Sequence, residues 1–193
     1  MMRNAIALAV LWMAAGIACA QASGVGTAKD VDGHTVDLLK QGHSRAVVLF
    51  FVASDCPISN RTLPEMKRVQ AEFADQGVSF WYVYPNATQT PQSIREHLAA
   101  FGVGDTALVD PRGLLGVTTG AKWTPEAVVM VPEKSGLKTV YVGRIDDRYL
   151  GIGRERPRAT QHDLEDAVSA VLVGRKPKPP GGPTVGCGIV RTP

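Results

Sequence analysis

The sequence contains few cysteines, little excess charge and no apolar run long enough for a stable membrane span. Its 193 residues include only three cysteines. The 21 basic side chains are balanced by 18 acidic ones, which leaves a net charge of +3 and argues against nucleic-acid binding. No nucleotide or flavin fingerprint is present, so the sequence implies no organic cofactor. The hydrophobic content of 45% is nevertheless enough for one domain with a core.

The first twenty residues have the pattern of a signal peptide. Arg3 precedes an apolar stretch from Ala5 to Ala15, and Ala18-Cys19-Ala20 is a small-x-small cleavage site. We therefore expect residues 1–20 to be removed near Ala20, leaving a periplasmic or secreted protein without a stable membrane span. An acylated Cys19 or a retained transmembrane helix are the less favoured alternatives.

The remaining chain alternates between strand-like and helix-like segments. Asp32-Gly33 suggests the turn of an N-terminal hairpin within 24–39. Continuous apolar runs at 46–53 and 78–84 predict buried strands, and Gly77 ends the helix between them. Further strands are expected at 107–109, 127–131 and 139–142, with helices at 58–76, at 90–101 after a Thr90-Pro91 start, and at 160–173. This pattern predicts an α/β fold with a mixed sheet.

Cys56 lies between the first buried strand and the first long helix. A cysteine at a helix N-terminus has its thiolate stabilised by the helix dipole and free N–H groups. Pro57 is compatible with the first helical position. The neighbouring Asp55 acts in the opposite direction, because a carboxylate disfavours a nearby thiolate. A reactive thiol is therefore favoured over an inert buried one.

Several motifs give this chain a family resemblance. They are Cys56-Pro57-Ile58-Ser59-Asn60-Arg61, Val83 to Asn86, Gly143 to Asp147, Val185 to Ile189, and Pro64 eight residues after Cys56. With Thr124-Pro125 before a core strand, the chain resembles the thioredoxin-like fold. More narrowly, it is similar to bacterial redoxin-domain proteins of the alkyl hydroperoxide reductase and thiol-specific antioxidant (AhpC/TSA) group.

The resemblance implies a three-layer α/β/α sandwich over residues 24–174, followed by a Pro/Gly-rich tail at 175–193. It also implies that Pro125 is cis and that the Thr124-Pro125 loop faces Cys56 and shapes the groove for a partner.

The chain departs from this family pattern in two ways. Thioredoxins carry a second cysteine three residues after the first, where this chain has Ser59, so local dithiol exchange is excluded. Peroxiredoxins carry a proline and a threonine seven and three residues before their reactive cysteine, where this chain has Leu49 and Ala53. Standard peroxidase chemistry is therefore not expected.

Cys187 is the second cysteine that remains after cleavage, and an even pair in an oxidising compartment suggests a disulfide or a redox couple. The tail from Gly174 is long enough to cross a small domain. Cys187 is therefore a candidate to resolve a disulfide on Cys56. A structural disulfide between Cys56 and Cys187 and a free thiol that pairs between molecules stay open.

A Cu(I) carrier is the main alternative function, since two thiolates suit this soft ion. His43, His97, His162, Met66 and Met130 are possible additional ligands. We expect Met66 and Met130 to lie in the core. His97 and His162, which fall on predicted helices, are expected at the surface.

The favoured function is an exported thiol-disulfide oxidoreductase or antioxidant redoxin acting on protein thiols or disulfides of the cell envelope. Cys56 is its nucleophile, Cys187 its resolving candidate, and Thr124 and Pro125 shape its groove. The sequence leaves its enzymatic status open. Asp146-Asp147-Arg148 is expected to form a surface turn, and Glu65 to be a partly exposed helix residue with a proton relay to Cys56 as the alternative.

Overall fold

A computed structural model describes residues 26–40, 43–104 and 106–190 of the chain. The expected signal peptide, with Cys19, lies outside the described residues. Among the helices that are described, none is long and apolar enough to cross a membrane.

A seven-stranded mixed sheet forms the centre of the fold, with the strand order β2-β1-β5-β4-β3-β7-β8. The N-terminal hairpin and the three parallel strands are β1 (Thr27–Asp30), β2 (Thr35–Asp37), β3 (Ala46–Phe51), β4 (Val78–Tyr84) and β5 (Ala107–Val109). The antiparallel end consists of β7 (Glu126–Glu133) and β8 (Gly136–Gly143). The predicted hairpin and mixed sheet are thus confirmed.

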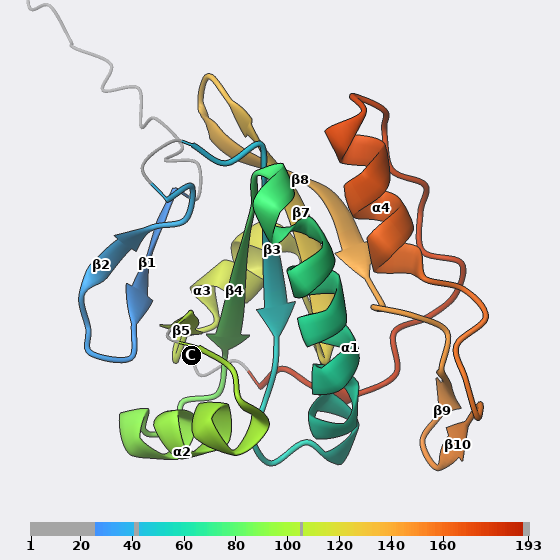
Figure 1. Cartoon of the computed structure of the whole chain (residues 1–193). Helices are drawn as coiled ribbons and strands as arrows, with labels where there is room; N and C mark the ends of the chain where they lie inside the picture. The colour runs from blue at the N-terminus through green and yellow to red at the C-terminus, as the bar shows by residue number, and fades with distance from the viewer. Residues whose placement is uncertain (1–25, 41–42, 105, 191–193) are drawn as a thin grey trace, which may run out of the picture.

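Helices cover both faces of this sheet, as expected for a three-layer sandwich (Figure 1). On one face, α1 (Pro57–Phe73), α2 (Pro91–Phe101) and α4 (Asp163–Leu172) share a buried apolar cluster with alternate residues of β3 and β4. The other residues of these strands pack with α3 (Leu114–Thr119) on the opposite face. Every side chain of β3 and β4 is therefore buried, which explains their continuous apolar sequences.

The helix boundaries follow local chemistry. The helix predicted to Gln76 ends earlier, at Phe73, and continues as a 3₁₀ turn, η1 (Ala74–Gln76), before Gly77 adopts a left-handed conformation with φ of 81°. Thr90 caps α2 by accepting a hydrogen bond from the Ser93 N–H at 3.2 Å. The short α3 was not anticipated, because six residues carry too little periodicity to indicate a helix.

The expectation of a surface turn at 146–148 is wrong for its central residue, since Asp147 is buried. Its carboxylate accepts hydrogen bonds from the Thr160 hydroxyl and from the backbone N–H groups of Thr160 and Gln161. The Arg156 Nε atom lies 3.3 Å from the same carboxylate. The backbone N–H groups of Thr160 and Gln161 are thus bound to Asp147, and α4 begins at Asp163 rather than at the predicted Thr160.

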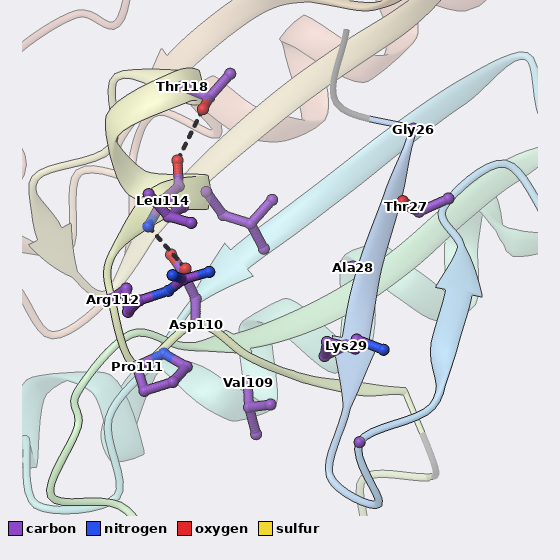
Figure 2. A pocket seen from close by; sticks show the side chains of 12 residues that line it. Gly26, Thr27, Ala28, Lys29, Val109, Asp110, Pro111, Arg112, Leu114 and Thr118 are labelled. Carbon is purple, nitrogen blue, oxygen red and sulfur yellow. Dashed lines mark hydrogen bonds between the residues drawn. The ribbon is translucent and has the colours of Figure 1, made fainter. Parts of the chain in front are cut away.

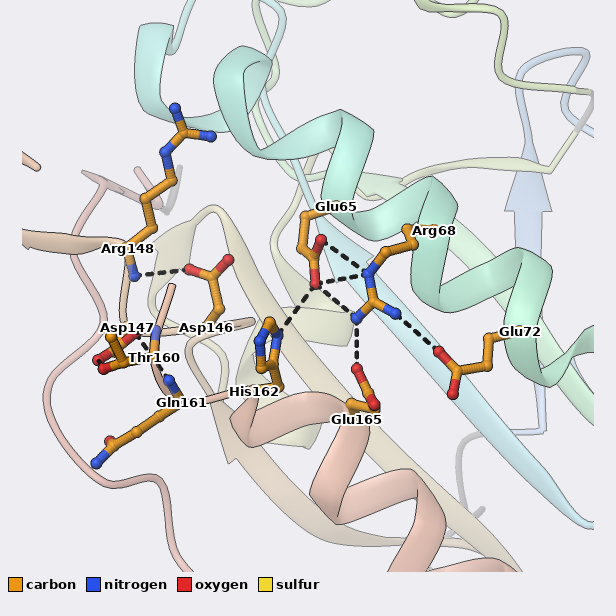
Figure 3. A network of polar contacts seen from close by, with 10 residues as sticks. All are labelled: Glu65, Arg68, Glu72, Asp146, Asp147, Arg148, Thr160, Gln161, His162 and Glu165. Atoms are coloured by element: carbon orange, nitrogen blue, oxygen red, sulfur yellow. Dashed lines mark hydrogen bonds and ion pairs between the residues drawn. The ribbon is translucent and has the colours of Figure 1, made fainter. Parts of the chain in front are cut away.

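A second polar network joins α1 to α4 (Figure 3). Arg68 of α1 pairs with Glu65 and Glu72 of its own helix and with Glu165 of α4. Glu65 also lies 3.4 Å from the Nδ1 atom of His162. The hydrogen bond from Arg68 outweighs burial and lowers the pKa of Glu65. Glu65 is therefore a structural ion-pair partner in this fold, and its carboxylate contacts Arg68 and His162 rather than either cysteine.

Beyond the central sheet, two short pairs of strands organise the loops of the described chain. The strands β9 (Tyr149–Gly151) and β10 (Arg154–Glu155) form a small hairpin. The strand β6 (Trp123–Thr124), just before β7, pairs antiparallel with β11 (Cys187–Gly188) from the tail. Residues that are 63 positions apart in the sequence thus become neighbours.

Asp147→Asn should lower the free energy of unfolding at pH 7 by about 2–3 kcal/mol, because it removes a buried charge that accepts several hydrogen bonds. Burial raises the pKa of Asp147, but the hydrogen bonds from Thr160 and Gln161 and the charge of Arg156 together lower it to about 2. The unfolded value is about 3.9, so the ionised carboxylate stabilises the fold fully above about pH 4. This contribution is lost as the pH falls towards 2.

Urea unfolding between pH 2 and pH 7 measures this effect, with Asp75→Asn as the control at an exposed carboxylate. The control should change stability by no more than about 0.5 kcal/mol. Equal stability curves for Asp147→Asn and the parent protein would contradict the assigned role.

Candidate functional site

Cys56 is held at the start of α1 by the end of the buried strand β3. Its extended backbone, with φ of −95° and ψ of 109°, places it at the N-cap position, and Pro57 follows as the first helical residue. The Cys56 N–H donates to the Ala53 carbonyl at 3.2 Å, while the Cys56 carbonyl accepts from the Asn60 N–H. The side chain is only 1% exposed. The predicted strand-to-helix junction is thus present, but the thiol is shielded from solvent.

The loop with the cis Thr124-Pro125 bond lies directly against this thiol. The Cys56 Sγ atom is 3.1 Å from the Thr124 carbonyl oxygen, to which the thiol donates. Both the cis bond and the proximity to Cys56 agree with what the family resemblance implied. Trp123, beside this loop, is 40% exposed.

Glu126 fixes the conformation of this loop. Its buried carboxylate accepts hydrogen bonds through Oε2 from the backbone N–H groups of Lys122 and Trp123, at 2.6 and 3.2 Å. The other oxygen, Oε1, accepts from the Thr184 hydroxyl at 3.0 Å. One carboxylate therefore ties the backbone around β6 to the C-terminal tail.

The tail brings Cys187 to Cys56. The two Sγ atoms lie 2.7 Å apart. Strand pairing sets this position, because Cys187 is opposite Thr124 and Gly188 is opposite Trp123. The Ile189 N–H donates to the Lys122 carbonyl at 2.9 Å and extends the pairing. The four residues singled out from the sequence as site residues, namely Cys56, Cys187, Thr124 and Pro125, therefore meet at one place.

Two close backbone approaches define the path of the tail. A Cβ atom on Gly186 would lie 2.3 Å from the Thr124 carbonyl oxygen, a distance that no side chain tolerates. A Cβ atom on Gly143 of β8 would lie 2.8 Å from the ring of Pro180. Glycine is required at both positions for the chain segments to pack this closely.

The two cysteines differ in solvent exposure, and the pKa of Cys187 is raised. Cys187 is exposed, whereas Cys56 is buried. Burial of part of its side chain, the hydrogen bond to the Cys56 sulfur, and the charges of Cys56 and Asp55 raise the pKa of Cys187 to about 11. Cys187 therefore keeps its proton at neutral pH and can donate it to the Cys56 sulfur.

A buried polar chain supports the loop before Cys56. The Tyr84 hydroxyl and the Asn60 Oδ1 atom each lie 2.8 Å from a ring nitrogen of His97, and Asn60 donates through Nδ2 to the Ser54 carbonyl at 2.9 Å. Burial lowers the pKa of His97, which favours the neutral ring that this arrangement needs. The expectation that His97 lies at the surface is wrong, because the ring turns from α2 towards α1. His162, in contrast, is partly exposed.

Among the described His, Cys, Asp and Glu side chains, none forms a three-ligand group with the cysteine pair. Among the described residues, the groups of three or more possible His, Cys, Asp and Glu ligands lie elsewhere, at Asp30, Asp32 and His34 and at Glu65, His162 and Glu165. Met66 and Met130 are both buried in the core, as expected. Any Cu(I) at the pair would therefore be bound by the two sulfurs alone among these side chains.

Two of the cavities in the described part of the chain differ in character. One of about 330 Å³ opens beside the site, between the start of α1, the β9–β10 hairpin and Cys187. Another of about 550 Å³ lies between β1 and the start of α3 (Figure 2). In it, Asp110 accepts a hydrogen bond from the Leu114 N–H at 2.8 Å. No cysteine lines this second cavity, so it is separate from the thiol chemistry.

Sequence reasoning missed Glu126, Gly186 and the chain from Tyr84 to Asn60. Gly186 had a visible signal, since it immediately precedes Cys187. The signal for Glu126 was weaker and consisted only of its position directly after Thr124-Pro125. His97 had none, because one histidine on an amphipathic helix does not reveal which neighbouring helix it contacts.

Comparison with known proteins gives a family match and several structural neighbours. The model of the AhpC/TSA family matches residues 24–142. A hypothetical protein from Sinorhizobium meliloti 1021 has a TM-score of 0.71 and 25% identity, over 86% of this chain and 90% of the other. An uncharacterized conserved protein from Geobacillus kaustophilus has a TM-score of 0.70 and 24% identity, over 86% and 88%. A putative thiol:disulfide interchange protein DsbE from Chlorobium tepidum has a TM-score of 0.51 and 20% identity, over 77% and 90%. No curated protein matches the chain.

Replacing Cys56 by alanine should lower the pKa of Cys187 from about 11 towards the ordinary value of about 8.5. The variant removes the hydrogen bond and the charge of Cys56, while partial burial of Cys187 remains. Ultraviolet thiolate titration measures the shift, in a Cys19→Ser background so that only the pair titrates. Asp55→Asn is the control, with a smaller decrease expected because Asp55 is the weakest of the causes. An unchanged Cys187 titration in Cys56→Ala would mean that the sulfurs do not interact.

Proposed function

The chain belongs to the AhpC/TSA family, and within it we propose that the protein is a thiol-disulfide oxidoreductase whose redox couple is Cys56 and Cys187. The observation that carries this proposal is the 2.7 Å contact between the two sulfur atoms. A disulfide bond is about 2.03–2.05 Å long, so a small approach of the tail would close it. Cys187 thereby takes the place of the second cysteine that Ser59 has replaced.

The chemistry follows from the unequal environments of the two thiols. The Cys56 thiolate attacks one sulfur of a partner disulfide and releases the other partner sulfur, which takes up a proton as a thiol. Cys187 then loses its proton and attacks the Cys56 sulfur, which releases the second partner sulfur. The partner gains two electrons and two protons, and the Cys56–Cys187 pair loses them. The reverse sequence oxidises a partner dithiol.

The surroundings of Cys56 favour disulfide exchange over peroxide reduction. Ala53 lies three residues before Cys56, so the hydroxyl that activates a peroxidatic cysteine is missing from that position. The Thr124 carbonyl, a hydrogen-bond acceptor, lies against the sulfur instead. Such an acceptor offers no hydrogen bond to the oxygen atoms of a bound peroxide, as a donor at this position would.

A structural disulfide and a Cu(I) carrier are the competing functions. The same sulfur contact supports each of them, since two adjacent cysteines can be cross-linked permanently or can bind a soft ion. The exposure of Cys187 beside an open cavity favours exchange, because an incoming thiol can reach this sulfur.

The partners are proposed to be protein thiols or disulfides of the cell envelope. The name of the Chlorobium tepidum neighbour describes thiol:disulfide interchange for that protein. For this chain, the proposal also rests on the signal-peptide pattern of residues 1–20, which favours a location in the periplasm or outside the cell, where disulfides persist.

Incubation of the Cys19→Ser protein with oxidised glutathione should produce an intramolecular Cys56–Cys187 disulfide. Its reduction potential should lie above about −300 mV, the value below which structural disulfides fall. Redox titration with alkylation and mass spectrometry gives both the bond and the potential. In Cys187→Ser, Cys56 should instead remain as a mixed disulfide with glutathione, since no resolving thiol is present.

The alternatives give different results in the same experiment. A potential below about −300 mV would favour a structural bond. Thiols that stay free under oxidation but together bind one Cu(I) would establish the carrier function. Either result would overturn the proposed exchange activity.

Export should yield a mature chain that begins at Gln21. Expression in a bacterium with a functioning secretory pathway, followed by fractionation and intact-mass measurement, tests this. Arg3→Glu, which reverses the charge of the n-region, is the control and should reduce export. A periplasmic chain that still includes residues 1–20 would refute cleavage, and a lipid mass on Cys19 would favour anchoring instead.

A further inference from the structure

The tail pairs with the edge of β6 that lies next to Cys56. Cys187 and Gly188 pair with Thr124 and Trp123, and the Ile189 N–H donates to the Lys122 carbonyl. The Ile189 side chain packs against the second apolar cluster, which includes Phe51 of β3. The tail thus satisfies a backbone edge by adding a short antiparallel strand, a mode of binding that a strand of another polypeptide can reproduce.

We propose that this edge binds an extended strand of a partner protein in which glycine precedes the reacting cysteine, and that the tail is its tethered, displaceable occupant. The thiol character of the partner rests on the proposed exchange function. The partner strand would replace Gly186 to Ile189 and bring its own sulfur to Cys56. The tail therefore has a second role besides carrying Cys187, since it closes the site when no partner is bound.

The contacts of the tail define what the edge accepts. The residue before the cysteine must lack a side chain, because a Cβ atom there would be 2.3 Å from the Thr124 carbonyl oxygen. One residue further on from the cysteine, at Gly188, a Cβ atom would meet only the Trp123 ring at 3.9 Å, an ordinary contact. An aliphatic residue fits the next position, where Ile189 is partly buried. The preferred partner segment is therefore glycine, cysteine, any small residue and an aliphatic residue.

The surface beside the pair offers room for the rest of a partner. The cavity of about 330 Å³ has Cys187 and Gly186 in its wall, together with Ile58 of α1. Ile152, at the tip of the β9–β10 hairpin, also lines it and is 84% exposed. A large aliphatic side chain exposed beside a reactive pair is suited to contact with an apolar polypeptide.

Displacement of the tail should expose Cys56, which is 1% exposed when the tail is bound. In a Cys19→Ser, Cys187→Ser background, Cys56 is the remaining thiol, and its alkylation rate reports how often the site opens. Gly186→Ala should raise this rate at least about 10-fold, because its Cβ atom cannot fit against Thr124. Gly188→Ala is the matched control, two residues away in the same strand, and should leave the rate within about twofold.

Thr184→Val is a second variant, which removes the hydrogen bond to Glu126 without adding a clash. It should raise the alkylation rate by a smaller factor, about 3-fold to 10-fold. Circular dichroism and thermal unfolding verify that each variant is folded. Equal rates in Gly186→Ala, Gly188→Ala and the background protein would overturn the proposal.

A synthetic peptide tests the partner specificity directly. The probe has the sequence of residues 183–190 with serine in place of Cys187, and its control has alanine in place of Gly186 as well. At millimolar concentration, the first peptide should slow Cys56 alkylation in the Gly186→Ala protein at least about 5-fold, and the control should not. No protection, or equal protection by both peptides, would overturn the proposed strand site. Because these proteins lack Cys187, the outcome is independent of whether the cysteine pair exchanges disulfides.

Discussion

The antiparallel pairing of Cys187 with Thr124 is the interaction on which the arrangement of the site depends. Thr124 contributes its backbone to the strand pairing, and its carbonyl oxygen lies 3.1 Å from the Cys56 sulfur. One residue therefore contacts both halves of the cysteine pair. This pairing places Cys187 beside Cys56 across 131 positions of sequence.

The rest of the fold supports that pairing from two directions. Glu126 fixes the loop of β6 and reaches the tail through Thr184, while the close contact between Gly143 and Pro180 holds the tail against β8. On the other side, the chain from Tyr84 through His97 and Asn60 braces the backbone before Cys56. Glu126 and His97 are buried polar residues with hydrogen-bond partners, which makes the geometry around them specific rather than adaptable.

The two cysteines have different environments, which suits them to different roles in the proposed exchange. Cys56 is buried at a helix start, whereas Cys187 is exposed and has a raised pKa. In the proposed exchange, Cys187 keeps its proton until it resolves the mixed disulfide on Cys56. Exposure and shielding are divided between two residues that thioredoxins place three positions apart.

The sequence by itself determined the central sheet, the position of Cys56 and the Thr124-Pro125 loop. Continuous apolar runs such as β3 can be stable only when both faces are covered, and a helix must follow where Pro57 and periodic apolar residues begin. It also indicated that a second thiol lay in the tail. These features depend on local composition and on short-range spacing.

Only the tertiary structure decided where the tail binds, which charged groups are buried, and which residues hold the two sulfurs together. Gly186, Glu126, His97 and Asp147 each owe their role to a neighbour that is distant in sequence. Burial and hydrogen bonding of a polar side chain depend on what packs against it, and no periodicity records that. Two polar residues expected at the surface, His97 and Asp147, were therefore misplaced, while the apolar core was correctly predicted. Burial of apolar residues follows from composition, whereas polar contacts require a particular geometry.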